Sequence, residues 1–372
     1  MVKPHYQIKN MNKTTKIIIG ILIIILAGGL IWFLTAQKSQ TSQIKIGVIA
    51  PLTGPLAEYG IAFKNGVELL NSQNSNPNVK YIFEDNQWDS KAAINAFNKL
   101  VQVDGVNAVI NWGTPTSEAI APLVKNTVPF IAITTEPPIT KLSSYIVRGG
   151  FNQPKDYIEK DWAYLRTHNV KKIAVIKTDI EYENSLFNEL QKEKNPDESV
   201  TLVDNVNLND TDFKTSIAKL SKQKYDAVGV LMASGQISIF YKQALQLNVA
   251  LPITFGSDFF ESQSEIDGAQ GLMNGAVYAN TGVTPDFESK YMSTYKNSSQ
   301  IASAGYGYDL AKIFNTIVDY TSKETILSSL KSVKDFSGVE GTLNYSEPTG
   351  DRYFSKPTYL KTILNNKVQV VN

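Results

Sequence analysis

Short apolar runs alternate with longer amphipathic segments from residue 44 to the C-terminal part of the chain. Most of these runs are continuous, which is typical of parallel strands buried on both faces. We expect strands at Ile44–Ala50, Lys80–Glu84, Ala108–Ile110, Phe130–Ile133, Lys172–Lys177, Thr201–Val206, Ala227–Met232, Ile253–Phe255 and Ala276–Ala279. We expect helices at Glu58–Asn71, Ser90–Val103, Ser117–Asn126, Pro154–Thr167, Glu181–Lys192, Asp212–Gln223, Gln236–Gln246, Asp286–Lys296 and Ile301–Tyr320. This alternation predicts an α/β fold built from right-handed βαβ units.

The predicted strands suit either one large sheet or two smaller ones. A break follows Arg148, where a predicted strand ends in Gly149 and Gly150 and a new helix begins near Pro154. We therefore favour two α/β lobes, and a chain of 372 residues is long enough for about two domains.

The N-terminal apolar run differs from these elements in length. Residues 17–36 carry no charge over 20 positions, which is enough to span a membrane as a helix. Lysines without acidic residues precede the run, so we expect residues 1–16 in the cytoplasm and the rest outside. Residues 37–43 form a short polar tether in this interpretation. A cleaved signal peptide is the alternative, and it stays open.

Composition narrows the chemistry. Lys and Arg total 36 and Asp and Glu total 35, so no large field of one sign favours nucleic acid. The chain has no cysteine, which excludes disulfides and Cys-ligated metals, and its two histidines are His5 and His168. The sequence lacks the local motifs of phosphate-binding loops, nucleophile elbows and zinc hydrolases. We therefore expect no catalytic residue, metal ion or cofactor.

Several segments, in order, carry a resemblance to a known family. Residues 44–70 combine a first strand, a Gly-Pro turn, Tyr-Gly and a helix with Asn-Gly; later come INWGTPTS at 110–117, FIAITTEPPIT at 130–140, FGSD at 255–258 and GVEGTLNY at 338–345. This series resembles the type I periplasmic binding proteins, in particular their leucine/isoleucine/valine-binding branch. The resemblance covers about residues 44–365.

The resemblance implies two Rossmann-like lobes joined by three chain crossings, with a ligand in the cleft. The crossings would lie near Arg148–Phe151, Tyr278–Gly282 and Gly341–Leu343. Lobe 1 would then comprise residues 44–149 and 282–342, and lobe 2 residues 150–281 and 343–372.

Loops that follow strands hold the ligand in open parallel sheets. By resemblance, Gly113 and Thr114 bind a ligand carboxylate at a helix N-terminus. A plain helix cap at Thr116 or Ser117 is the alternative for this loop, and both can hold at once.

Other positions extend this expected site. By the same resemblance, Asp258 binds an ammonium group and aromatic rings cover the ligand; the remaining expected contacts come from loop side chains. The full set is Tyr59, Gly113, Thr114, Thr134, Thr135, Glu136, Tyr182, Ser234 and Asp258. Glu136 departs from the family pattern, because an acid beside a carboxylate repels it.

The resemblance implies an extracytoplasmic protein that binds an amino acid or a related small polar ligand and delivers it to an ABC permease. The alternative is a sensory ectodomain of the same fold that acts through a partner protein. Fold alone does not separate the two functions.

Overall fold

The computed structural model describes residues 43–73, 76–297 and 299–371. Contacts divide the chain into Met1–Gln43 and one compact unit, Ile44–Asn372, which is the part considered below. The predicted membrane span at 17–36 and its flanks at 1–16 and 37–42 lie outside the described residues. Among the residues that are described, no helix combines the length and apolarity needed to cross a bilayer.

The first sheet has eight strands in the order β11-β12-β13-β5-β4-β3-β1-β2. Its central strands are parallel, with Ile46 opposite Tyr81 and Val48 opposite Ile110. Its strands are β1 (Ile44–Ala50), β2 (Val79–Asp85), β3 (Ala108–Trp112), β4 (Phe130–Ile133), β5 (Ile146–Gly149), β11 (Phe336–Gly338), β12 (Gly341–Ser346) and β13 (Tyr353–Ser355). β11, β12 and β13 pair with one another antiparallel and extend the edge beyond β5.

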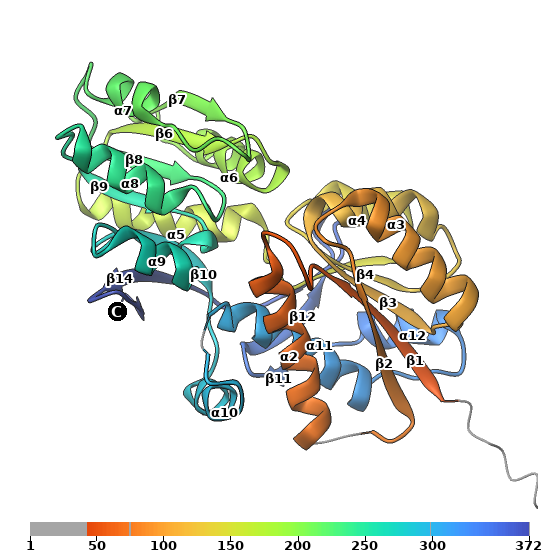
Figure 1. Ribbon diagram of the computed structural model, residues 1–372. Helices are drawn as coiled ribbons and strands as arrows, with labels where there is room; N and C mark the ends of the chain where they lie inside the picture. The colour runs from red at the N-terminus through yellow and green to blue at the C-terminus, as the bar shows by residue number, and fades with distance from the viewer. Residues whose placement is uncertain (1–42, 74–75, 298, 372) are drawn as a thin grey trace, which may run out of the picture. The chain divides into compact units, whose positions relative to one another are not determined.

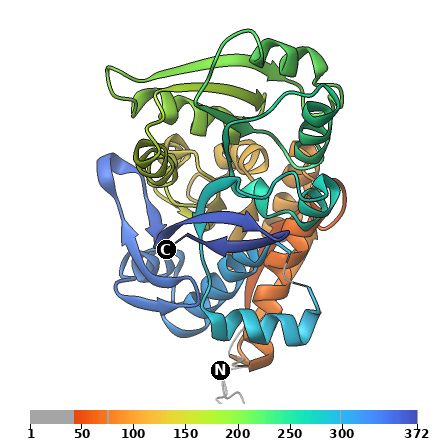
Figure 2. The same cartoon turned by 90° about the vertical axis from the view of Figure 1, so that its left-hand side faces the viewer.

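The second sheet has seven strands in the order β15-β14-β10-β9-β8-β6-β7. These are β6 (Lys172–Thr178), β7 (Ser199–Val206), β8 (Ala227–Leu231), β9 (Ile253–Gly256), β10 (Val277–Thr281), β14 (Thr358–Leu364) and β15 (Lys367–Val370). The C-terminal hairpin, dark blue in Figure 2, joins this sheet where β14 pairs antiparallel with β10.

Helices cover both faces of each sheet (Figure 1). Helices α2 (Ala57–Gln73), α3 (Ser90–Asn98), α4 (Thr114–Val124), α10 (Pro285–Tyr295), α11 (Ile301–Thr316) and α12 (Lys323–Lys331) accompany the first sheet. Helices α5 (Pro154–Thr167), α6 (Glu181–Lys192), α7 (Lys214–Leu220), α8 (Ile237–Gln246) and α9 (Gln263–Ala269) accompany the second. Short helical turns are η1 (Lys99–Asp104), η2 (Pro137–Leu142), η3 (Asp258–Glu261) and η4 (Pro348–Gly350). The expected two-lobed α/β fold is confirmed.

Glycine sets the close approach of α2 and α11. A Cβ atom on Gly66 would lie 1.9 Å from the carbonyl oxygen of Ala304, and one on Gly307 would lie 2.1 Å from that of Phe63. Both helices therefore contact backbone to backbone. This packing holds the N-terminal turns of α2 beside the carboxyl ends of the first sheet's strands.

The chain passes between the sheets after β5, after β10 and again before β14. The third passage lies between Ser355 and Thr358, further along the chain than the expected Gly341–Leu343. The expectation was wrong because β12 and β13 belong to the first sheet, where Tyr353 pairs with Arg148. A boundary at residues 342/343 would divide that sheet's edge.

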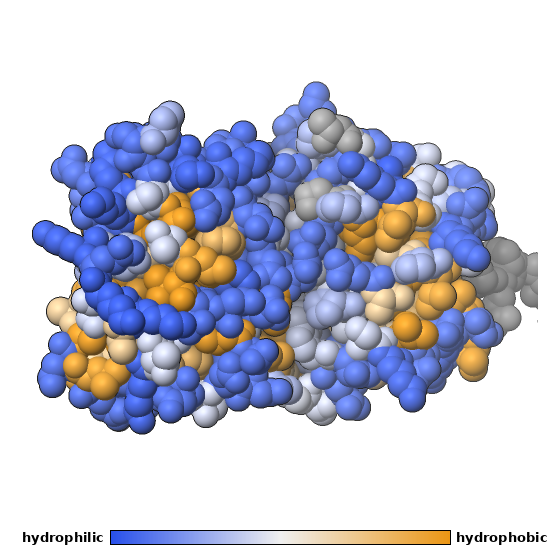
Figure 3. All heavy atoms as spheres, turned by 90° about the horizontal axis from the view of Figure 1, so that it is seen from above, coloured by the Kyte–Doolittle hydropathy of each residue, from blue (hydrophilic) through white to orange (hydrophobic). Residues whose placement is uncertain are grey.

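The surface seen from above is mostly hydrophilic, with apolar residues gathered in separate areas (Figure 3). Leu208 is one of the exposed large apolar side chains, with 41% of its surface accessible. It lies in the loop after β7, and it also lines the cavity described next.

Candidate binding site

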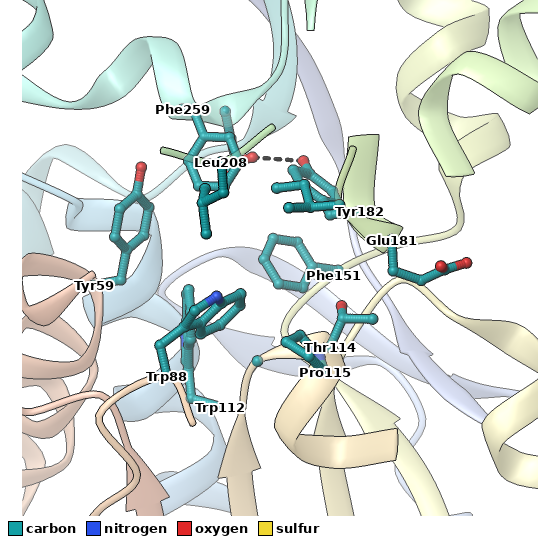
Figure 4. Close-up of a pocket in the computed structure, with 13 residues that line it drawn as sticks. Tyr59, Trp88, Trp112, Thr114, Pro115, Phe151, Glu181, Tyr182, Leu208 and Phe259 are labelled. Carbon is teal, nitrogen blue, oxygen red and sulfur yellow. Dashed lines mark hydrogen bonds between the residues drawn. The ribbon is translucent and has the colours of Figure 1, made fainter. Parts of the chain in front are cut away.

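A cavity of about 310 Å³ lies between the two lobes, at the carboxyl ends of strands from both sheets. Figure 4 shows side chains from both lobes and from the first crossing pointing into it. The lining residues are Tyr59, Trp88, Trp112, Gly113, Thr114, Pro115, Phe151, Ile180, Glu181, Tyr182, Leu208, Asp258 and Phe259. This is the position at which open α/β sheets bind ligands.

Five aromatic side chains form a closed belt around the cavity. Each ring contacts the next, with centroids 5.4 to 6.4 Å apart. The members of the aromatic belt are, in order, Tyr59, Trp112, Phe151, Tyr182 and Phe259. Tilted and edge-on arrangements of this kind stabilise aromatic clusters beyond the effect of buried area. The belt therefore gives the cavity a rigid apolar wall.

A sixth ring, Trp88, also lines the cavity, and its centroid lies 5.7 Å from that of Trp112. Its loop follows β2, and both Gln87 and Trp88 have positive φ angles, 52° and 59°. The side chain of Asn86 accepts a hydrogen bond from the Trp88 amide at 2.9 Å and stabilises this turn. A Cβ atom on Gly113 would lie 2.4 Å from the Trp88 ring, so glycine is required beneath it.

Thr114 provides a buried hydroxyl at the N-terminus of α4. Thr134 donates a hydrogen bond to the Thr114 oxygen at 2.9 Å, which leaves the Thr114 hydrogen available for a ligand acceptor. The helix begins at Thr114 with Gly113 as its N-cap, so the alternative cap at Thr116 or Ser117 is wrong. Thr116 and Ser117 lie in the first turn of α4, and their hydroxyl oxygens accept hydrogen bonds from the side chain of Asn111 on β3.

Asp258 provides the acidic group on the second lobe. It begins η3, is buried, and accepts a hydrogen bond from the Tyr182 hydroxyl at 2.5 Å. Burial raises the pKa of Asp258 to about 7; the Tyr182 hydrogen bond opposes this shift and Glu261 adds to it. The other acid among the lining residues, Glu181, is exposed, and its carboxylate points away from the belt in Figure 4.

No lysine, arginine or histidine is among the lining residues in the described part of the chain. The cavity thus combines one buried acid, one hydroxyl at a helix N-terminus and an aromatic wall. A positively charged group near Asp258 would be favoured by charge and by the faces of the rings.

The structure brings Tyr59, Gly113, Thr114, Tyr182 and Asp258 together around the cavity. The other four expected residues lie outside its lining. Thr134 supports Thr114 from behind, and Ser234 donates a hydrogen bond to the Ser262 hydroxyl at 3.3 Å.

Thr135 and Glu136 lie at the edge where the lobes meet. The Thr135 hydroxyl is 3.4 Å from that of Ser185 on α6. Glu136 lines a separate hollow, where burial, followed by the charges of Glu181 and Glu118, raises its pKa to about 7. Glu136 is therefore not among the residues that line the interlobe cavity.

Several lining residues were absent from the expected set, although some are neighbours of its members. Trp112 precedes Gly113 and Phe259 follows Asp258. Since ligands bind at the carboxyl ends of strands in open α/β sheets, both positions could have been included. Phe151 lies in the first crossing, at the position that the resemblance implied for it. Trp88 and Leu208 come from loops whose contacts depend on tertiary packing.

Comparisons with known proteins agree with this architecture. The profile of the family described as "Periplasmic binding protein" matches residues 43–366. A "Leu/Ile/Val-binding protein BraC3" from Rhizobium johnstonii is 24% identical over 332 residues, which cover 83% of this chain and 89% of the relative.

Two solved structures show the same fold. A leucine-binding protein from Thermotoga maritima has a TM-score of 0.79 at 20% identity, covering 88% of this chain and 98% of its own. A branched-chain amino acid transporter substrate-binding protein from Streptococcus pneumoniae, in complex with isoleucine, has a TM-score of 0.76 at 22% identity, covering 88% and 99%.

Proposed function

We propose that this chain binds an amino acid in the interlobe cavity and delivers it to an ABC permease. The chain belongs to the type I periplasmic binding protein family and to its leucine/isoleucine/valine-binding branch. The relatives are named as binding proteins or transporter components, which supports a solute-binding role without catalysis. The observation that carries the proposal is the pair formed by Asp258 and Thr114, which line the same cavity from different lobes.

The two groups suit the two ends of a zwitterion. Asp258 meets the ammonium group through charge-assisted hydrogen bonds. The Thr114 hydroxyl and the N-terminus of α4, a helix of 11 residues, meet the carboxylate. One ligand then touches both lobes, so binding stabilises the arrangement in which they are closed.

The second-lobe contact leads to a direct test by calorimetry on the full-length chain in detergent. We expect at least one standard amino acid to bind. Asp258→Asn should weaken that binding about 30-fold or more, because loss of one partner of a buried charged pair costs ~2–5 kcal/mol.

The matched control is Asp267→Asn, an exposed acid on α9 outside the cavity lining. It should bind within about threefold of the wild type. Equal affinity of both variants and the wild type would remove Asp258 from the site, and failure of every amino acid to bind would overturn the proposed function.

Residues 17–36 complete the proposal as an uncleaved membrane anchor that keeps the binding unit near its permease. The support is the uncharged apolar run of 20 residues and the lysines before it. N-terminal sequencing of the mature protein tests this part. A chain that starts between residues 27 and 44 would show that the segment is a cleaved signal instead.

A further inference from the structure

We propose that the cavity selects an amino acid whose side chain is an aromatic ring, and that Trp88 determines this preference. This inference rests on the proposed function and specifies its ligand class. It starts from the side chains that face the space beyond Asp258 and Thr114. Aromatic rings supply six of the thirteen lining residues, and Ile180 and Leu208 are the aliphatic ones.

The closed aromatic belt offers both faces and edges to a ligand. Phe259 stands nearly perpendicular to Tyr59 and to Tyr182, at 86° and 84°. A ligand ring placed in this wall gains stacked and edge-on contacts that an aliphatic side chain of similar size does not make. The ammonium group of the same ligand lies near ring faces as well as near Asp258.

Trp88 is set apart from the belt by its backbone. Two successive residues with positive φ place it, and such conformations persist where the surrounding structure demands them, frequently at ligand sites. Gly113 lacks the side chain that would displace the indole ring. Two loops thus place one large, half-buried ring at the cavity.

Trp88 is also the most suitable position for a test. It is half-buried, and it contacts the belt through Trp112 alone among the aromatic pairs of the described residues. Its replacement therefore leaves the belt in place. The belt members themselves are poorer choices, because Tyr59, Trp112 and Phe259 are buried and contribute to the fold.

The experiment is calorimetry on the full-length chain with L-phenylalanine, L-leucine, phenethylamine and 3-phenylpropionate. We expect phenylalanine to bind at least tenfold more tightly than leucine. Phenethylamine, which keeps the ammonium group, should bind more tightly than 3-phenylpropionate, which keeps only the carboxylate.

Variants locate the preference at Trp88. Trp88→Leu should reduce the phenylalanine-to-leucine affinity ratio at least fivefold, while Trp88→Phe, which retains a ring, should stay within twofold of the wild-type ratio. Tyr359→Leu, which removes an exposed ring on β14, is the control and should leave the ratio unchanged. Circular dichroism verifies that each variant is folded.

The outcomes separate the two proposals. Tighter binding of leucine than of phenylalanine would overturn the aromatic preference and leave the proposed function standing. An unchanged ratio in folded Trp88→Leu would overturn the role of Trp88. Binding of 3-phenylpropionate without either amino acid would overturn the proposed function as well as the inference.

Discussion

At the residue scale, the protonation of Asp258 controls the charge of the cavity. Its pKa of about 7 follows from burial, so the side chain is largely neutral at pH 5 and largely charged at pH 8. A cationic ligand group needs the charged form. We expect affinity for an amino ligand to rise with pH up to about 7 and then level off.

Binding should be up to about 100-fold weaker at pH 5 than at pH 8. At pH 5, two units below the pKa, only about one Asp258 side chain in 100 is deprotonated. Calorimetry across this range checks it. Asp258→Asn should bind weakly with little pH dependence, and a flat profile in the wild type would contradict the assignment.

Glu183 is a second buried acid, and it affects stability instead of binding. Its Oε1 accepts a hydrogen bond from Ser257 at 2.6 Å, and its Oε2 has no partner among the described residues. Burial, opposed by the Ser257 hydrogen bond, raises the pKa of Glu183 to about 8. The pKa of Glu183 in the folded protein exceeds its value of ~4.3 in the unfolded chain. The contribution of protonated Glu183 to the unfolding free energy is therefore complete below pH ~4.3 and is lost as pH rises to about 8.

Glu183→Gln removes this loss because the amide stays neutral. We compare the unfolding free energy of the variant with that of the wild type at each pH. This difference should favour the variant more at pH 8.5 than at pH 5, on the order of a few kcal/mol. Urea unfolding at both pH values measures the difference. Glu159→Gln, exposed on α5, serves as the control, and an equal effect of Glu183→Gln at both pH values would count against a charged buried carboxylate.

At the element scale, a buried ion pair stabilises the edge of the first sheet. Arg148 on β5 contacts Asp351 through Nη2 at 2.6 Å and Nε at 3.0 Å, with side-chain exposures of 0% and 4%. A third guanidinium contact reaches the Thr134 carbonyl at 2.8 Å. The pair therefore joins β5 at the first crossing to the segment before the third.

Arg148→Met should lower the unfolding free energy by about 3–5 kcal/mol, because it leaves a buried carboxylate without its partner. Arg148→Met combined with Asp351→Leu should recover part of that loss. Lys290→Met removes the exposed pair with Asp286 and should cost less than about 1 kcal/mol. Urea unfolding measures all three, and a single Arg148→Met variant as stable as the Lys290 control would contradict this role.

The elements that could be predicted from sequence are those whose signal is local. Continuous apolar runs identified β1, β4 and β8, since such runs mark strands covered on both faces. The C-terminal strands were missed because they depend on distant partners: β13 joins its sheet through Tyr353 and Arg148. The half-buried pattern of β14 is equally ambiguous without its antiparallel neighbour β10.

The same distinction applies to the site. Gly113, Thr114 and Asp258 follow strands directly, so topology places them at the cavity. Thr134 also follows a strand, but its hydroxyl is occupied by Thr114, which no local pattern reveals. Trp88 reaches the cavity through a backbone turn with positive φ angles, which the local sequence does not predict.

At the scale of the whole binding unit, the lobes touch directly beside the cavity. Ser262 of the second lobe donates a hydrogen bond to Glu58 on α2 at 2.8 Å, and Thr135 lies near Ser185 at 3.4 Å. Beside these polar contacts, the rings of Tyr59 and Phe259 meet across the lobes with centroids 5.7 Å apart. A bridging ligand adds further stabilisation to the closed arrangement. A ligand held by Asp258 and Thr114 provides it, because the ligand binds the closed state better than any open one.

We therefore expect ligand to compact the protein and to stabilise it. The radius of gyration from small-angle scattering should fall at saturating ligand, and the unfolding free energy should rise by about 2.7 kcal/mol at a ligand concentration 100 times Kd. Asp258→Asn at the same ligand concentration should show a smaller decrease in radius of gyration, and its unfolding free energy should rise by only about 0.9 kcal/mol for 30-fold weaker binding, since one lobe has lost its contact. Saturation seen by calorimetry with an unchanged radius of gyration would contradict closure by the ligand, because a ligand shifts the lobes only as far as it favours one arrangement over the other.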